Sequence, residues 1–146
     1  MKKTNNKGFT LVELIVVLVI LAILAAILVP ALLGYIDRAR EKQVTTNAEA
    51  AYVAAQAKMT DAYAKYGDPK DYVKKDEIDK LADITEDFEF GATTDAAYSA
   101  DAPAKNMYII TAFTYYSDTY KQTATWNGSE WTVSAGKNLV GTYKSE

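Results

Sequence analysis

The chain has 146 residues, a formal net charge of −3, and neither cysteine nor histidine. These counts exclude disulfide bonds, thiol chemistry, Cys/His zinc sites and every triad or general base that uses histidine. Carboxylate or lysine chemistry survives, but no catalytic motif accompanies it, so we expect a non-enzymatic protein without metal or cofactor. Lys2, Lys3 and Lys7 lie among the first eight residues without an acid, which leaves an acidic remainder. That remainder argues against nucleic acid as the main partner, because phosphate binding requires a basic surface.

Residues 14–33 form an uncharged, strongly apolar run, and a helix of about 20 such residues can cross a bilayer. The short lysine-rich end should stay in the cytoplasm, which leaves the bulk of the chain outside. A cleaved secretory signal peptide is the alternative, with small residues at Ala22, Ala25 and Ala26. The end of the run offers no clean Ala-x-Ala cleavage site, so the sequence favours a retained membrane helix.

The residues just before the apolar run, 7–14, read KGFTLVEL. This string resembles the type IV prepilin signature K-G-F-T-L-x-E-L at every position. The resemblance implies that a membrane peptidase cuts between Gly8 and Phe9, that the apolar helix is retained, and that Phe9 becomes a methylated N-terminus. A glycine can also simply interrupt local structure, but the place of Gly8 between Lys7 and Phe9 favours cleavage. Residues 1–8 are then a leader, carrying the charges of Lys2, Lys3 and Lys7.

Two residues of the apolar segment, which we take as 9–36, are candidates for a role in assembly. The charged side chain of Glu13 would have a high free-energy cost in a membrane unless a partner neutralised it. Cleavage creates such a partner, the free amine of Phe9. The resemblance implies pairing with a neighbouring subunit during assembly, whereas an intrachain pair on the same helix face remains the alternative. Pro30 removes a helical hydrogen bond; it produces either a kink or, as the resemblance implies, a segment that melts within the fibre.

The helical pattern continues over residues 37–66, which we read as an amphipathic extension of the same helix. Apolar residues recur there at spacings of three, four and one, and the stretch is rich in alanine. Gly67 and Pro69 are plausible stop signals. We assign Tyr52, Met59 and Tyr63 to the core of the external domain in preference to a ligand site.

Residues 67–146 should form a globular head. Its first part, 68–89, is highly charged and predicts a short helix over 75–82 with Ile78, Leu81 and Ala82 on its apolar side. Four acids could hold calcium, but they lack the spacing and central glycine of an EF-hand loop, so we favour a solvated face. These acids are Asp83, Glu86, Asp87 and Glu89.

The last forty residues predict an antiparallel sheet of three or four strands packed on the helix. Residues 106–116, with both faces apolar, indicate a central strand. Asn127-Gly128 predicts a two-residue hairpin turn that pairs Trp126 with Ser129, and residues 137–143 are a candidate edge strand. Asn127-Gly128-Ser129 also matches a glycosylation acceptor, which we read as turn chemistry. The predicted core residues of the sheet are Ile109, Phe113, Trp126, Trp131 and Val133. The expected fold class is therefore α+β: a long N-terminal helix on a small antiparallel sheet, as in pilins.

The function expected from the resemblance is that of a structural subunit of a type IV pilus. Its partners would be identical subunits, the prepilin peptidase and methyltransferase, and an assembly platform with separate ATPases, since the chain has no phosphate-binding glycine loop. It would begin in the cytoplasmic membrane and end in a surface filament. The first alternative is a pseudopilin of a type II secretion or DNA-uptake machine. A ligand-binding or catalytic membrane protein is the second, and it has little support in the sequence.

Overall fold

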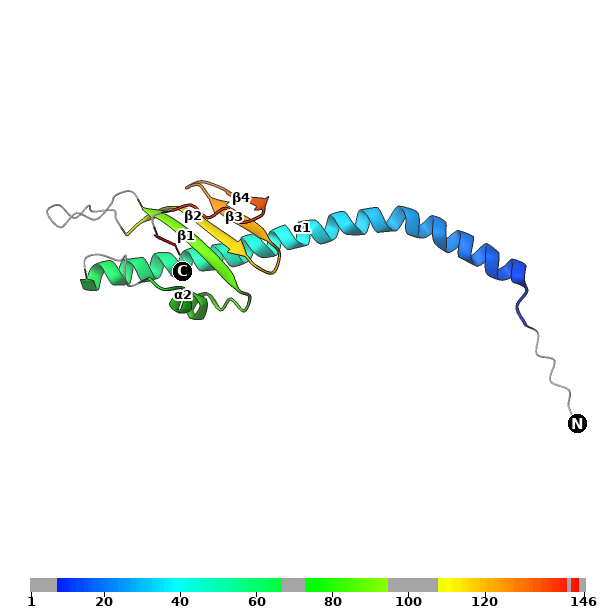
Figure 1. Cartoon of the computed structure of the whole chain (residues 1–146), viewed down its shortest axis with the longest axis horizontal. Helices are drawn as coiled ribbons and strands as arrows, with labels where there is room; N and C mark the ends of the chain where they lie inside the picture. Colours follow the sequence, from blue (N-terminus) through cyan, green and yellow to red (C-terminus); the bar gives the residue numbers. More distant parts are fainter. Residues whose placement is uncertain (1–7, 67–72, 95–107, 142, 145–146) are drawn as a thin grey trace, which may run out of the picture. The chain divides into compact units, whose positions relative to one another are not determined.

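The computed structural model describes residues 8–66, 73–94, 108–141 and 143–144. It divides into two compact units, Met1–Ala39 and Arg40–Glu146, and the first helix, α1 (Leu11–Tyr66), contributes residues to both. The predicted stop signals Gly67 and Pro69 lie outside the described residues, as do the leader lysines Lys2, Lys3 and Lys7. The second unit, called the head below, contains α2 (Lys75–Ala82) and five strands (Figure 1).

The part of α1 within the head is the amphipathic helix that the sequence predicts. Its buried face carries small side chains, which allow the sheet to approach closely, and one long flexible filler, Met59, with no exposed surface. Tyr52 is half-buried against this core, and Tyr63 stacks on the ring of Tyr108 with centroids 4.7 Å apart. The fully or nearly buried residues on this face are Val44, Ala48, Ala51, Ala54, Ala55, Met59 and Ala62.

The sheet is antiparallel throughout, with strand order β4-β3-β2-β1-β5. The strands are β1 (Phe88–Thr94), β2 (Ile110–Ser117), β3 (Gln122–Trp126), β4 (Trp131–Ala135) and the two-residue β5 (Tyr143–Lys144). β2 is the central strand, as predicted. The predicted small antiparallel sheet is confirmed, with one strand more than the three or four expected. The strand that the sequence analysis missed is β1, which begins within an acidic stretch that suggested a loop. Its own pattern alternates, with Phe88, Phe90 and Ala92 buried in the core.

One core assignment was wrong because of a bulge in β2. Thr94 pairs with Ile110 and Thr93 with Ala112, so the intervening residue has no direct partner. An extra residue reverses the alternation of faces. Ile110 therefore joins Phe113 in the core, while Ile109 precedes the strand and keeps 39% of its surface exposed.

The β3–β4 hairpin was predicted with the correct face but the wrong register. Trp126 pairs with Trp131 and not with Ser129, so the pairing is displaced by two residues. The turn is centred on Gly128 and Ser129: the φ of Gly128 is +97°, whereas Asn127 has no positive φ, as an Asn-Gly type I′ turn would require. The Oδ1 of Asn127 accepts hydrogen bonds from the N–H and the hydroxyl of Ser129 and from the N–H of Glu130. A shift of two preserves the face, so the predicted core residues Trp126, Trp131 and Val133 all pack against the core.

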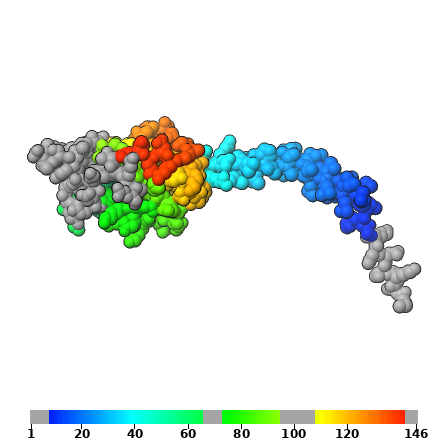
Figure 2. Space-filling model, in the orientation of Figure 1, coloured from blue at the N-terminus to red at the C-terminus, as the bar shows by residue number. Residues whose placement is uncertain are grey.

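The outer face of the sheet is covered by residues 136–141, here called the strap, whose red atoms form part of the head surface in Figure 2. The hydroxyl of Thr123 donates to the carbonyl of Gly136 and accepts from the N–H of Asn138. The hydroxyl of Thr114 accepts from the N–H of Val140 at 3.2 Å and lies 3.1 Å from its carbonyl oxygen. The edge strand predicted over 137–143 is displaced toward the C-terminus. The backbone of the strap bonds to side chains across the face, and the edge strand β5 pairs with β1 at Tyr143–Lys144.

The acidic segment around α2 is attached to the core through Glu86. One carboxylate oxygen of Glu86 accepts from Asn47 of α1 and from the Tyr115 hydroxyl, each at 2.6 Å, and the other accepts from Ser117 at 2.7 Å. Asp87 and Glu89 instead form ion pairs with Lys75 and Lys137.

Helix α2 has its predicted bounds, with Ile78 buried, but Leu81 is 54% exposed and does not belong to the apolar side. No group of three potential metal ligands occurs among the residues that the structure describes. Glu86, one of the acids considered for calcium, has a structural partner on each oxygen instead.

Candidate functional site

The candidate site is the N-terminal end of α1, within the first unit. Gly8, Phe9 and Thr10 are exposed and belong to neither helix nor strand, and α1 begins at Leu11. The predicted cleavage bond, Gly8–Phe9, therefore lies just outside the helix, two residues before its first turn. Its exposure leaves it accessible, and a Cβ added to Gly8 would meet nothing within 4 Å.

Thr10 and Glu13 form a capping box, which is a reciprocal pair of hydrogen bonds at a helix start. The Oε2 atom of Glu13 accepts from the backbone N–H of Thr10 at 2.7 Å and from its hydroxyl at 2.8 Å. The Thr10 hydroxyl oxygen in turn accepts from the N–H of Glu13 at 3.3 Å. These bonds satisfy donors that otherwise lack partners in the first turn, and loss of such a cap costs about 0.5–2 kcal/mol.

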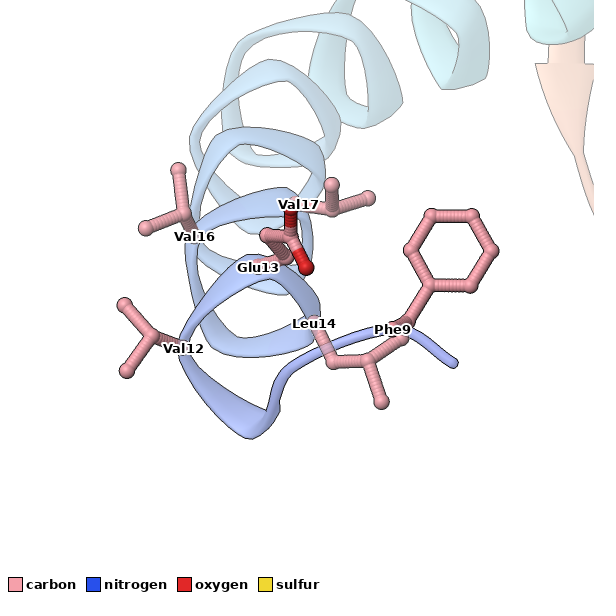
Figure 3. A pocket seen from close by; sticks show the side chains of 6 residues that line it. All are labelled: Phe9, Val12, Glu13, Leu14, Val16 and Val17. Atoms are coloured by element: carbon pink, nitrogen blue, oxygen red, sulfur yellow. The ribbon is translucent and has the colours of Figure 1, made fainter. Parts of the chain in front are cut away.

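Apolar side chains surround this polar pair. A shallow hollow is lined by Glu13 and five apolar residues, and Figure 3 shows Val12 and Val16 on one side of Glu13 with Phe9, Leu14 and Val17 on the other. Phe9 precedes the cap residue and Leu14 is the fourth residue after it, the positions of a hydrophobic staple. The string FTLVEL thus places both helix-start motifs directly after the predicted cut.

Past Glu13, the helix carries only apolar or uncharged side chains as far as Ile36, and its large ones are at least 38% exposed. An uncovered apolar surface of this length indicates that lipid or other protein covers it. The helix is long and apolar enough to cross a membrane by length and composition. Pro30 lies inside the helix, which continues past it to Tyr66.

The structure places Gly8, Phe9 and Glu13 together at one helix end, as the sequence analysis expected. The capping role of Thr10 was missed, although the signal was present: Thr-x-x-Glu before an apolar run is the sequence pattern of a capping box. The staple position of Leu14 was also missed, although an apolar residue on each side of the cap is its sequence signal.

Residues 3–29 match the family model described as the prokaryotic N-terminal methylation motif. Comparisons with curated proteins and with solved structures gave no significant match. The matched segment is the class III leader of type IV pilins and pseudopilins. This motif indicates a type IV pilin-like or pseudopilin precursor, and the long apolar helix with a small antiparallel sheet is a pilin-like α+β arrangement. The leader implies processing by a prepilin peptidase and assembly into a pilin-type filament, and with the apolar helix it fits a membrane-anchored precursor.

Proposed function

We propose that this protein is a non-enzymatic structural subunit of a type IV pilus, cut between Gly8 and Phe9 and assembled through its N-terminal helix. The observation that carries the proposal is the arrangement at the helix start. A single carboxylate, Glu13, lies one turn after the predicted cut in the otherwise uncharged and uncovered apolar segment 9–36.

The carboxylate has a physical role in such an assembly. A charged side chain inside a bilayer costs about 2.5–3.5 kcal/mol on insertion scales, so it persists where a partner neutralises it. Cleavage produces a cationic amine on Phe9. Pairing that amine with Glu13 of a neighbouring subunit would neutralise both charges and align the incoming helix. The methylated amine keeps its charge and remains a suitable partner.

The apolar helix has the surface that a fibre core requires. Its side chains would be covered by lipid in the precursor and by neighbouring helices in the filament, where close packing replaces lipid contacts. The head carries its own core and would lie on the outside. The expected partners are identical subunits, the peptidase and methyltransferase, and the assembly platform with its ATPases, and the expected location is a surface filament.

A pseudopilin of a secretion or DNA-uptake machine shares the leader and is the second candidate. The presence of Glu13 supports a repeated core subunit in either machine, because every subunit in a stack needs the same charge partner. Filament length distinguishes the two, since a pilus extends well beyond the cell surface and a pseudopilus remains short.

The test is the intact mass and N-terminal sequence of the protein in filaments sheared from its native cells. The proposal expects a chain that begins at methylated Phe9 and sediments as a filament. A chain that begins at Met1, or is cut near Ala26 and recovered as a soluble monomer, contradicts it. In cells that carry Glu13→Ala, we expect normal cleavage with little filament. Normal filaments from this variant would refute the charge pairing.

A further inference from the structure

We infer that Asn127 is a site of self-catalysed deamidation: in the folded head, the backbone nitrogen of Gly128 displaces the side-chain amide nitrogen as ammonia, and water then leaves a carboxylate at position 127. The modification adds a negative charge to the β3–β4 turn as the protein ages. It requires only the folded head and is independent of the proposed function.

The turn leaves the reacting groups open to water. Asn127, Gly128, Ser129 and Glu130 are all exposed. Within the described part of the chain, neither the Nδ2 group of Asn127 nor the N–H of Gly128 forms a hydrogen bond. The leaving group and the nucleophile therefore have no bond that must break before they react. Because Gly128 has no Cβ, its backbone nitrogen can approach the side-chain carbonyl of Asn127 closely.

Three donors converge on the atom where negative charge develops during this reaction. The Oδ1 atom of Asn127 accepts from the N–H and the hydroxyl of Ser129, each at 2.9 Å, and from the N–H of Glu130 at 3.0 Å. A backbone N–H can only donate, so the accepting atom is the amide oxygen and not the nitrogen. When the Gly128 nitrogen attacks Cγ, electrons of the C=O bond move onto Oδ1. Donors that are already in place stabilise this oxyanion without reorganisation.

The reaction has two steps and consumes one water molecule. In the first step the Gly128 nitrogen gives its proton to solvent and bonds to Cγ of Asn127, while the bond from Cγ to Nδ2 breaks. Ammonia leaves after taking up a proton, and a cyclic succinimide remains. In the second step water adds to one of the two ring carbonyls and the ring C–N bond at that carbon breaks. Addition at Cγ gives aspartate, whereas addition at the main-chain carbonyl gives isoaspartate, and neither route oxidises or reduces any group.

The same donors favour aspartate as the product. They polarise the ring carbonyl at Cγ, which directs water to that carbon. The new carboxylate then accepts the hydrogen bonds that the amide oxygen accepted, and these become charge-assisted. Isoaspartate would instead add a carbon to the backbone directly after Trp126, which pairs with Trp131 at the end of the hairpin ladder. The expected product is therefore an aspartate that adds charge beside Glu130 and leaves the hairpin intact.

The test incubates the full chain in detergent micelles at neutral pH, both folded and in urea. Peptide mass spectrometry then separates asparagine, aspartate and isoaspartate at each site. In the folded chain, Asn127 should deamidate at least about tenfold faster than Asn47, which has no such set of donors on its oxygen and whose Nδ2 donates to Glu86. An Asn127 that stays unmodified in the folded chain but reacts in urea would show that the turn protects it, and this overturns the inference.

Substitutions at Ser129 test the part played by the donors. Ser129→Ala removes the hydroxyl and retains the Asn-Gly pair and both N–H donors. It should slow deamidation of the folded chain by about two- to tenfold, the factor that corresponds to one ordinary hydrogen bond, and leave the rate in urea unchanged. Ser129→Thr keeps the hydroxyl and is the matched control, with the wild-type rate expected. Equal slowing by both variants, or slowing by Ser129→Ala in urea as well, would contradict stabilisation by the turn.

The identity of the product is a separate check. The ratio of aspartate to isoaspartate should be higher in the folded chain than in urea, and an equal ratio would overturn the directing role of the donors. Asn127→Asp places the expected product in the turn directly. Its urea unfolding, followed by tryptophan fluorescence, should show a midpoint no lower than that of the wild type. A lower midpoint would show that the carboxylate disrupts the hairpin, contrary to the inference.

Discussion

Replacing Thr114 by valine tests how the head closes its sheet without a disulfide. Thr114 is 1% exposed and lies in the central strand, where its hydroxyl meets both backbone groups of Val140 in the strap. It also lies 3.3 Å from the carbonyl oxygen of Gly91. Valine has nearly the same shape, so the substitution removes the hydrogen bonds and leaves the packing almost unchanged.

The expected loss of stability follows from the polar groups that the substitution leaves without a hydrogen-bond partner. A typical hydrogen bond contributes about 0.5–1.5 kcal/mol net, and a buried polar group left unpaired costs about 1–3 kcal/mol. Thr114→Val leaves the N–H and the carbonyl of Val140 without this partner, and water at the edge of the strap compensates in part. We therefore expect the free energy of unfolding of the head to fall by about 2–3 kcal/mol, which for a domain of about 100 residues lowers Tm by about 4–8 °C per kcal/mol.

The assay is urea unfolding of the full chain in detergent micelles, followed by tryptophan fluorescence. Trp126 and Trp131 are the two tryptophans of the chain and lie in the β3–β4 hairpin, so the signal reports on the head. Thr114→Ser keeps the hydroxyl and is the control. It should lose less than Thr114→Val, because it removes one methyl group at about 1 kcal/mol. Hydrogen exchange at Val140 reports on the strap directly.

A free energy of unfolding for Thr114→Val within about 0.5 kcal/mol of the wild type, the scatter of ordinary surface substitutions, would refute this role of Thr114 if Val140 also keeps its protection from exchange. The same holds if Thr114→Ser is the more destabilised of the two. Either result would mean that the strap is held by contacts other than the Thr114 hydroxyl.

Three further substitutions test other parts of the chain. Gly91→Ala should destabilise the head by about 1–3 kcal/mol in the same unfolding assay, because an added Cβ would overlap the carbonyl oxygen of Val140. Wild-type stability would show that the strap moves to make room. Burial and the hydrogen bond to Glu86 raise the pKa of Tyr115. The folded head keeps this proton, while the unfolded chain releases it above about pH 10. The free energy of unfolding should therefore fall as the pH rises above about 10, more steeply in the wild type than in Tyr115→Phe. Equal dependence on pH for the two proteins in an alkaline unfolding series would contradict this. A large residue at Gly8, such as phenylalanine, should block cleavage of the precursor, whereas Gly8→Ala should be partly processed. An immunoblot that separates precursor from mature chain measures both. Normal processing of both variants would show that the peptidase does not recognise this position.

Local sequence determined the helix start and the buried stripe of α1. The capping box joins residues three apart, and the staple joins residues five apart, so both depend on backbone that the helix itself positions. The stripe from Val44 to Met59 follows from the helical period, and that face is buried as predicted. In the β3–β4 hairpin, alternation alone assigned the correct face, because a register error of two residues leaves the face unchanged.

Tertiary structure decided what local pattern could not express. The bulge that brings Ile110 into the core in place of Ile109 depends on how β2 pairs with β1. The strap bonds to Thr114, 26 residues earlier, and Glu86 bonds to Asn47, 39 residues earlier. Such contacts join segments distant in sequence, and side-chain hydroxyls and carboxylates can take many partners. Only the folded sheet and helix bring one particular set of partners within hydrogen-bonding distance.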